Sequence, residues 1–408
     1  MERFDLLLFL CYTCTSKQAT PNNQKGVDNM AITVSVNGAV NELSNPKAPR
    51  ETLTTFNVAT AHGLDDLYEK ARVQQSNCKD TIIPEANLEN FAVYANEPVL
   101  YDRGEVPFPF KAHFTDNDTV EAGHFTDYAF GQFCNKLSIP SAYMYKCYDA
   151  GLTELAEKNL NTWTDHYEKD LLIRQYYDAE KERNLIRGVL SSKYSVFDTP
   201  EILEVIEDNT RGLDLKVKSY FMNYERFHAR MIQQEKMNID GEDLFAGISI
   251  DSSDVGRSTL LVTFFIYKQV CTNGLCISKG NAQLFKQKHV NITPDEFSTE
   301  FAASLTLLPE LIEEYEYVIK RVKTRNSITP IKSLKTATDK ELENLIDILR
   351  AKTKLAEEGA KKIVETADLK YDFSDWGVIN AITEVAQDYT LERRIELERI
   401  AGSMLRVS

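Results

Sequence analysis

Carboxylates and one histidine form a single cluster with the chemistry of a metal site. Asp116, Asp118 and Glu121 lie at short spacing, and His124 and Asp127 follow directly. Oxygen-rich clusters can bind divalent cations, but a calcium loop also needs a central glycine and a terminal glutamate, which this sequence lacks. We therefore interpret the cluster as a polar loop leading into a helix. We predict no metal site and no cofactor, and a metal-dependent nuclease is the weakest functional hypothesis.

No arrangement of nucleophile and base can be recognised in the sequence. The histidines are widely separated and form no H-x-x-x-H or H-E-x-x-H pair. The phosphate-binding motif G-x-x-x-x-G-K-[ST], the dinucleotide motif G-x-G-x-x-G and the nucleophile motif G-x-S-x-G do not occur. We assign no catalytic residue, and the sequence favours a protein that is not an enzyme.

The cations are better placed to bind a ligand. The chain has a formal net charge of −15, with 62 acidic and 47 basic side chains among its 408 residues. This balance disfavours a protein that coats duplex DNA by charge alone. Yet residues 255–294 and 317–338 contain no acidic residue and several lysines and arginines. Such windows are typical of surfaces that bind an anion.

Strand alternation predicts a basic sheet face. In the segment 226–231, Arg226, His228 and Arg230 share one face of a strand, and in the preceding strand Lys216 and Lys218 share a face with a tyrosine. Cations that follow the phosphates, with rings that stack on bases, are how proteins hold single strands. A solvated outer face whose charges serve solubility is the alternative. The residues that we predict to bind nucleic acid are Arg187, Lys193, Lys216, Lys218, Arg226, His228, Arg230, Arg257, Lys268, Lys279, Lys286 and Lys288.

Cysteine usage and the N-terminus bear on the compartment. The seven cysteines are odd in number and scattered, which predicts reduced thiols in a cytoplasm rather than a disulfide framework. Cys11-x-x-Cys14 and Cys271-x4-Cys276 could supply metal ligands only by joining across most of the chain. The apolar run at 6–11 is too short to span a bilayer and follows an acidic segment. We take residues 1–29 as a disordered or mis-assigned leader before Met30, and we predict no membrane association.

Periodicity predicts an α+β fold, with a central, mainly antiparallel sheet flanked by N-terminal helices and a C-terminal helical region. Helical spacing covers 62–74 and 124–162. Strands are expected at 171–177, 185–190, 215–222, 226–232, 244–250 and 259–270, with an Asn273-Gly274 turn closing the last. Capping boxes at 293–296 and 338–341 open later helices. We divide the chain into the leader at 1–29, an arm and short helix at 30–90, a core domain at 91–325 and a helical region at 326–408.

Several ordered blocks of sequence resemble one family. They are RGVLSSKY followed by FD at 187–198, GISIDSSDVG at 247–256, FIYKQVCTNG at 265–274 and LSIPSAY at 137–143. These blocks are similar to R-A-V-L-S-x-x-Y, G-x-x-x-x-N-S-E-V-G, a strand ending in C-T-N-G, and L-G-I-P-x-x-Y. These four consensus patterns are those of the phage/plasmid-like proteins catalogued as domain of unknown function 932, which the chain therefore resembles. The similarity covers roughly residues 90–325. The chain departs at 252–254, where the family often has Asn-Ser-Glu, so no role for that asparagine is carried over.

The resemblance implies a gene of a phage or mobile element that acts in the cytoplasm of a bacterial host, without an established activity. Together with the basic windows, it predicts a protein that binds single-stranded DNA in replication or recombination and that could assemble with copies of itself. The alternative is a non-enzymatic phage protein that binds a host or virion protein, as a host-defence antagonist or structural factor. The acidic character of residues 51–250 favours that second hypothesis.

Overall fold

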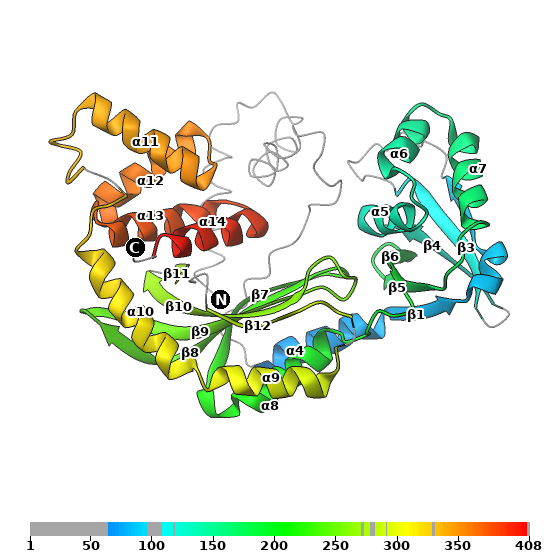
Figure 1. Cartoon of the computed structure of the whole chain (residues 1–408), viewed down its shortest axis with the longest axis horizontal. Coiled ribbons are helices and arrows are strands. Elements are labelled where there is room, and N and C mark those ends of the chain that lie inside the picture. Colours follow the sequence, from blue (N-terminus) through cyan, green and yellow to red (C-terminus); the bar gives the residue numbers. More distant parts are fainter. Residues whose placement is uncertain are drawn as a thin grey trace, which may run out of the picture.

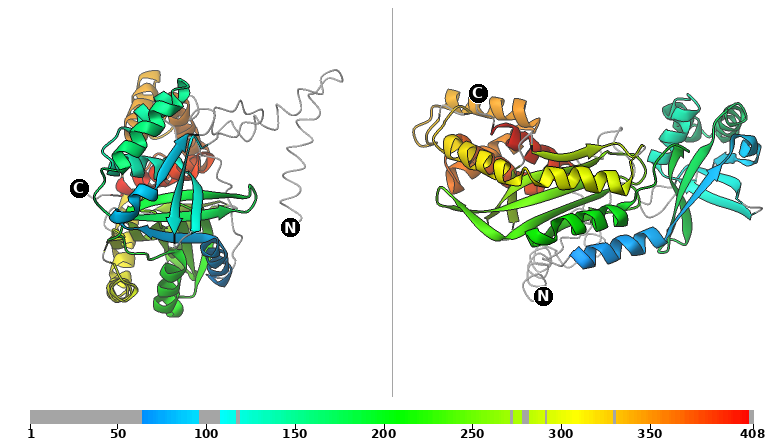
Figure 2. Two further views of the ribbon diagram at one scale, coloured as in Figure 1. Left: turned by 90° about the vertical axis from the view of Figure 1, so that its right-hand side faces the viewer. Right: turned by 60° about the horizontal axis from the view of Figure 1, so that its bottom comes forward.

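A computed structural model describes residues 64–95, 108–116, 119–270, 273–277, 282–290, 292–328 and 331–405. The predicted leader, the arm up to residue 63, Cys11, Cys14 and Lys279 lie outside these residues. The described residues form two six-stranded, mostly antiparallel sheets with helices on them, so the fold is α+β as predicted. Each sheet has a core of its own, which gives the molecule two lobes (Figures 1 and 2).

The first sheet has the strand order β1-β5-β6-β4-β3-β2. Its strands are β1 (Cys78–Ile83), β2 (Ala92–Ala95), β3 (Phe110–Asp116), β4 (Thr119–Phe125), β5 (Leu171–Asp178) and β6 (Arg183–Ser191), with the 3-10 turn η1 (Glu85–Asn90) between β1 and β2. All neighbours pair antiparallel except β4 and β6, which are parallel where His124 lies opposite Leu185. The helices α5 (Asp127–Lys136), α6 (Ser141–Asp149) and α7 (Thr153–Thr164) complete this lobe.

Aromatic side chains bind α5 to this sheet. The helix begins where the Thr126 hydroxyl accepts a hydrogen bond from the backbone N–H of Ala129. Phe130 and Phe133 then face the strands, and the Phe130 ring stacks on Phe110 with centroids 4.2 Å apart. The last turn of α5 carries Asn135 and Lys136, which lie near residues 256–259 and 288–290 of the second lobe.

The second sheet is the predicted meander. Its order is β11-β10-β9-β8-β7, and β12 also pairs with β10. The strands are β7 (Leu215–Met222), β8 (Phe227–Ile239), β9 (Glu242–Ser252), β10 (Leu260–Val270), β11 (Asn273–Ile277) and β12 (Gln283–Gln287). The β8–β9 turn places Asp240 and Gly241 at φ 51° and 83°, the left-handed conformation that tight hairpins favour.

Helices cover both faces of the second sheet. In Figure 1, α4 (Leu64–Ser76), α8 (Thr199–Thr210), α9 (Pro294–Leu305) and α10 (Leu308–Lys323) lie below it. The helices α13 (Asp375–Val385) and α14 (Leu391–Ser403) lie above its β11 end, and α11 (Asp339–Thr353) and α12 (Glu357–Lys370) follow α10 along the chain. Short 3-10 turns, η2 (Arg211–Leu213) and η3 (Ala386–Asp388), follow α8 and α13. Both predicted capping boxes are confirmed, at Thr293 and Thr338.

Three local predictions differ from the structure. The strands at 171–178 and 183–191 belong to the first sheet, so there are two sheets rather than one central sheet. Residues 119–125 form strand β4, and the helical segment begins only at Asp127. Asn273 and Gly274 lie in strand β11, where Asn273 pairs with Val270 and Gly274 with Gln269. The dipeptide that we predicted as a turn is therefore part of a strand.

Candidate functional site

The two lobes meet at a buried arginine network, which we define as Arg174, Arg187, Asp198 and Asp254. Arg174 projects from β5 of the first sheet. Its guanidinium donates to both carboxylate oxygens of Asp198, at 2.7 and 2.6 Å, and to Asp80 at 2.9 Å. It also donates to the backbone carbonyl of Asp254, in the β9–β10 connection of the other lobe. The network therefore fastens the start of α8 and the β9–β10 connection to the first sheet.

Arg187, which we predicted to bind nucleic acid, belongs to this network instead. Its side chain is 0 % exposed, because it lies on β6 and points into the boundary between the lobes. One of its nitrogens donates to the carbonyl of Tyr224 at 3.0 Å and lies 3.4 Å from the Asp254 carboxylate. A ligand in solvent cannot reach this guanidinium, so its role is structural.

The two carboxylates of this network, Asp198 and Asp254, repel each other. Burial, with the neighbouring charge of Asp198 as a second cause, raises the pKa of Asp254 from its ordinary 3.8 to about 6. The arginines and the Thr199 hydroxyl, which donates to Asp254 at 3.1 Å, only partly offset that effect.

A cleft of about 600 Å³ lies beside the network, where the lobes approach each other. We call it the inter-sheet cleft. Its walls come from the end of α5, the end of β6, the β9–β10 connection and the segment after β12. None of the described residues that line it is acidic. The lining residues are Gln132, Asn135, Lys136, Val189, Leu190, Ser191, Tyr194, Gly256, Arg257, Ser258, Thr259, Lys288, His289 and Val290.

Gln132 and Gly256 shape the wall of the cleft. The Gln132 amide bridges the lobes: it donates to the carbonyl of Val255 at 2.8 Å and accepts from the backbone N–H of Val189 at 2.9 Å. Gly256 has φ 75°, which lets the β9–β10 connection turn closely against the ring of Tyr194. The wall is therefore held by directional bonds before any ligand enters.

Three cations line the cleft, and they differ in how they are held. Arg257 donates to Glu225 at 2.5 Å and lies over the Tyr128 ring, so a carboxylate from outside the lining partly neutralises it. Lys136 is half-buried, and burial, with Lys169 as a second cause, lowers its pKa. Lys288 is exposed and makes no ion pair with a described residue. A fourth cation, Lys193, is exposed and precedes Tyr194, which bridges to Val290.

An aromatic pair forms part of the cleft wall. The rings of Tyr194 and His289 stack with centroids 5.7 Å apart and an angle of 12° between their planes. The Tyr194 hydroxyl donates to the carbonyl of Ser253, and burial raises its pKa. His289 Nε2 lies 3.1 Å from the Ser252 hydroxyl, and burial lowers the pKa of the imidazole from 6.5 to about 4.

The predicted basic sheet face is not open. Alternation along β8 is as expected, since Phe227, Ala229 and Met231 pack in the core of the second lobe. However, Arg230 is buried and bound to Glu398, and His228 is buried and 2.8 Å from Asp251. The reason is that α14 delivers Glu398 to this face from 168 residues away. The expectation of an exposed Arg226, His228 and Arg230 surface is therefore wrong for its last two members.

The other predicted cations are dispersed. Lys216 pairs with Asp214 at 3.5 Å, and Lys218 lies over the ring of Tyr267. Lys268 pairs with Glu242 at 2.9 Å. Arg226 is half-buried beside the β7–β8 turn, and Lys286 is exposed on β12. Of the predicted set, the structure brings Arg257, Lys288 and the adjacent Lys193 together, and Lys279 lies outside the described residues.

The acidic cluster of the sequence does not converge on a metal. Within the described ranges, no group of three or more potential ligands is arranged to hold an ion. Glu121 binds Lys79 at 2.7 Å, and Asp127 accepts from the Tyr145 hydroxyl at 2.7 Å. Asp118 lies outside those ranges, as does the side chain of Asp116.

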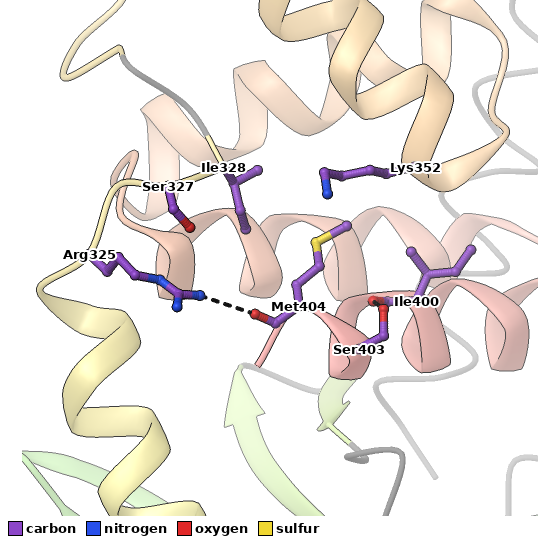
Figure 3. A pocket seen from close by; sticks show the side chains of 7 residues that line it. All are labelled: Arg325, Ser327, Ile328, Lys352, Ile400, Ser403 and Met404. Carbon is purple, nitrogen blue, oxygen red and sulfur yellow. Dashed lines mark hydrogen bonds between the residues drawn. The ribbon is translucent and has the colours of Figure 1, made fainter. Parts of the chain in front are cut away.

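A second, smaller pocket of about 360 Å³ lies between the segment after α10, α11 and α14 (Figure 3). Arg325, from the second acid-free window, and Lys352 provide its positive charge. The Arg325 guanidinium is bound to the fully buried Asp375 and reaches the carbonyl of Met404. This arginine serves the packing of the C-terminal helices, so the inter-sheet cleft is the better candidate site.

Sequence reasoning missed part of the cleft. Tyr194 stands in one of the family blocks and His289 follows Lys288 in the acid-free window, so both carried a signal. Gln132 and Lys136 carried none, because they come from a helix more than a hundred residues before that window and only the fold brings them there.

Among the described residues, no helix has the length and apolar character required to cross a membrane.

Comparison with known proteins gives one match. No curated protein and no solved structure matches the chain. The model of the family described as Domain of unknown function (DUF932) matches residues 187–402, further toward the C-terminus than the resembling blocks and without the block at 137–143. Since this range covers more than half of the sequence, the protein belongs to the DUF932 family.

Proposed function

We propose that the protein binds single-stranded nucleic acid through the inter-sheet cleft. The observation that carries the proposal is a lining whose described residues include three cations and no carboxylate, in a chain of net charge −15. Phosphates are attracted to such a local positive site even when the whole molecule is anionic. Lys193 adds a further exposed cation beside the cleft.

The rest of the lining also suits a single strand. Amide and hydroxyl groups of Asn135, Ser191, Ser258 and Thr259 can hydrogen-bond to sugars, phosphates and base edges. Tyr194 brings an aromatic ring to the wall, and rings favour unpaired bases. A cleft of about 600 Å³ has the size of a small-ligand site, which suits a few nucleotides rather than a duplex. With the sequence resemblance to phage/plasmid-like proteins, this supports a role in replication or recombination of a mobile element inside a bacterial host.

The test is a salt titration of oligo(dT) binding, measured by fluorescence anisotropy. We expect binding that weakens with salt, and in Lys193→Glu/Lys288→Glu a lower affinity with a shallower slope, by about 0.7 for each phosphate that the variant no longer neutralises. The matched control is Lys332→Glu/Lys340→Glu, which changes the net charge equally at exposed positions before and in α11. No binding by the wild type at low salt would refute the proposal, and an equal loss in both variants would refute the cleft as its site.

A further inference from the structure

His289 presents a hydrogen-bonding atom that the protein leaves unused. The residue lines the inter-sheet cleft, yet its side chain is only 3 % exposed. Nε2 lies 3.1 Å from the Ser252 hydroxyl oxygen, whereas Nδ1 is buried and has no hydrogen-bond partner among the described residues. Buried polar atoms are mostly satisfied. Of the buried side-chain polar atoms without a partner among the described residues, Nδ1 of His289 is the one that belongs to the lining of the cleft, and this position points to a ligand.

The protonation of the ring follows from its surroundings. Ser252 is 1 % exposed, and among the described residues His289 is the only hydrogen-bond partner of its hydroxyl. If Nε2 carried the proton, the serine hydroxyl would have no acceptor. The hydroxyl therefore donates to Nε2, and in a neutral ring the proton sits on Nδ1. The ring is neutral at neutral pH, because burial lowers the pKa of His289 to about 4.

We infer that the inter-sheet cleft recognises a phosphate group, to which the Nδ1–H of His289 donates a hydrogen bond while Arg257 and Lys288 supply positive charge. A buried N–H donor requires an acceptor, and an acid-free wall with cations selects an anionic one. Stacking against Tyr194 fixes the direction of the N–H. The inference deepens the proposed function, on which its nucleic-acid form rests: it makes the phosphate, rather than the base, the recognised group.

Phosphate recognition has a consequence for specificity. Contacts to phosphate position a strand but carry no sequence information. Homopolymers of different bases should therefore bind with similar affinities. Inorganic pyrophosphate should compete with them, since it offers the same acceptor atoms without a base or a sugar.

The test compares pyrophosphate, oligo(dT) and oligo(dA) on the wild type and on His289→Phe/Ser252→Ala. This double substitution keeps a ring beside Tyr194 and removes both the N–H and the hydroxyl that would lose its acceptor. We expect both oligonucleotides and pyrophosphate to bind about tenfold or more weakly, as for the removal of a hydrogen bond to a charged acceptor. The control is His166→Phe on an exposed histidine after α7, which should change nothing.

The outcomes separate the two proposals. Oligonucleotide binding that the double substitution leaves unchanged would overturn the inference and leave the proposed function standing. Pyrophosphate binding that depends on His289, without binding of oligonucleotides, would support the inference and overturn the proposed function. No binding of any probe would overturn both. Should the double variant fail to fold, long-range ¹H–¹⁵N spectra of the wild type decide. Nδ1 should be protonated at pH 7 and shift on addition of pyrophosphate, and protonated Nε2 or an unchanged shift would refute the inference.

Discussion

Removal of the Arg174 guanidinium should be among the most destabilising single changes in the protein. The side chain is 1 % exposed and bound to both oxygens of Asp198, which is itself buried, and to Asp80. In Arg174→Met, the Asp198 carboxylate would keep only Arg187, at 4.0 Å, as a cationic partner among the described residues. Breaking a buried ion pair from one side costs about 3–5 kcal/mol, because the remaining charge stays desolvated. We expect a loss of that size in the free energy of unfolding.

A double-mutant cycle measures the interaction itself. Asp198 precedes α8 at the N-cap position, but its carboxylate makes no capping bond and is used by Arg174 instead. Asp198→Asn keeps a residue that N-cap positions favour. The double variant should therefore lose less stability than the two single losses together, by about 2 kcal/mol or more.

The assay is urea unfolding followed by circular dichroism, with Arg211→Met as the control. Arg211 pairs with Asp208 at 2.6 Å, but both side chains are largely exposed, so its loss should cost less than about 1 kcal/mol. Added salt should leave the cost of Arg174→Met almost unchanged, because a buried pair is poorly screened. A cost of Arg174→Met no larger than that of the control, or additive single effects, would refute this account of the network.

The remaining predictions concern pH and packing. The pKa of Asp254 in the folded state is about 6, above its ordinary 3.8. The stability that this carboxyl contributes is therefore complete below pH 4 and is lost as pH rises through 6. Over that range, the free energy of unfolding of the wild type relative to Asp254→Asn should fall by about 3 kcal/mol. For His289 the pKa is instead lowered, from 6.5 to about 4 in the folded state, so the stability of the wild type relative to His289→Gln should be lost as pH falls over the same window, by a similar amount. Urea titrations at several pH values check both predictions. Stability curves of wild type and variant that run parallel with pH would contradict them. A Cβ at Gly247 would lie 2.6 Å from a carbonyl of β8 and 2.7 Å from the Phe265 ring, so Gly247→Ala should cost about 1–3 kcal/mol. Gly131, in the interior of α5 with open space around it, should tolerate alanine or gain up to about 1 kcal/mol, and equal melting temperatures of the two variants would contradict that account.

Local patterns were sufficient for much of the second lobe. The strand at 215–222 and the capping boxes at Thr293 and Thr338 follow from alternation and from side chains that bond to their own backbone neighbours. Strand β4 was missed, because Ala122 and Gly123 interrupt its alternation with residues that carry no strand signal. Gly123 is there because a Cβ would lie 2.9 Å from Ile186 on the parallel neighbour β6, a pairing that no short-range pattern encodes.

The site was predictable only in part, because charge along a chain differs from charge on a surface. Arg230 has no adjacent acidic residue on its own strand, yet α14 supplies Glu398 to it. Arg325 stands in an acid-free window and is bound to Asp375 from α13. Lys268, in the other window, is paired with Glu242 on β9. In each case the neutralising carboxylate comes from a different element. An acid-free stretch of sequence therefore does not by itself show that its cations are unpaired.

What keeps the inter-sheet cleft positive is therefore the composition of every element that reaches it. The β9–β10 connection and the segment after β12 bring Arg257 and Lys288, and the end of α5 brings an amide and Lys136 where a carboxylate would close the site. Glu225 approaches Arg257 from outside the lining, and Lys288 makes no such pair with a described residue. Four described segments converge on the cleft, and none of the residues that line it is acidic, although the β9–β10 connection carries Asp254 and the chain has more acids than bases. The proposed binding of an anion would account for this lining, whereas solubility would be served by a charge of either sign.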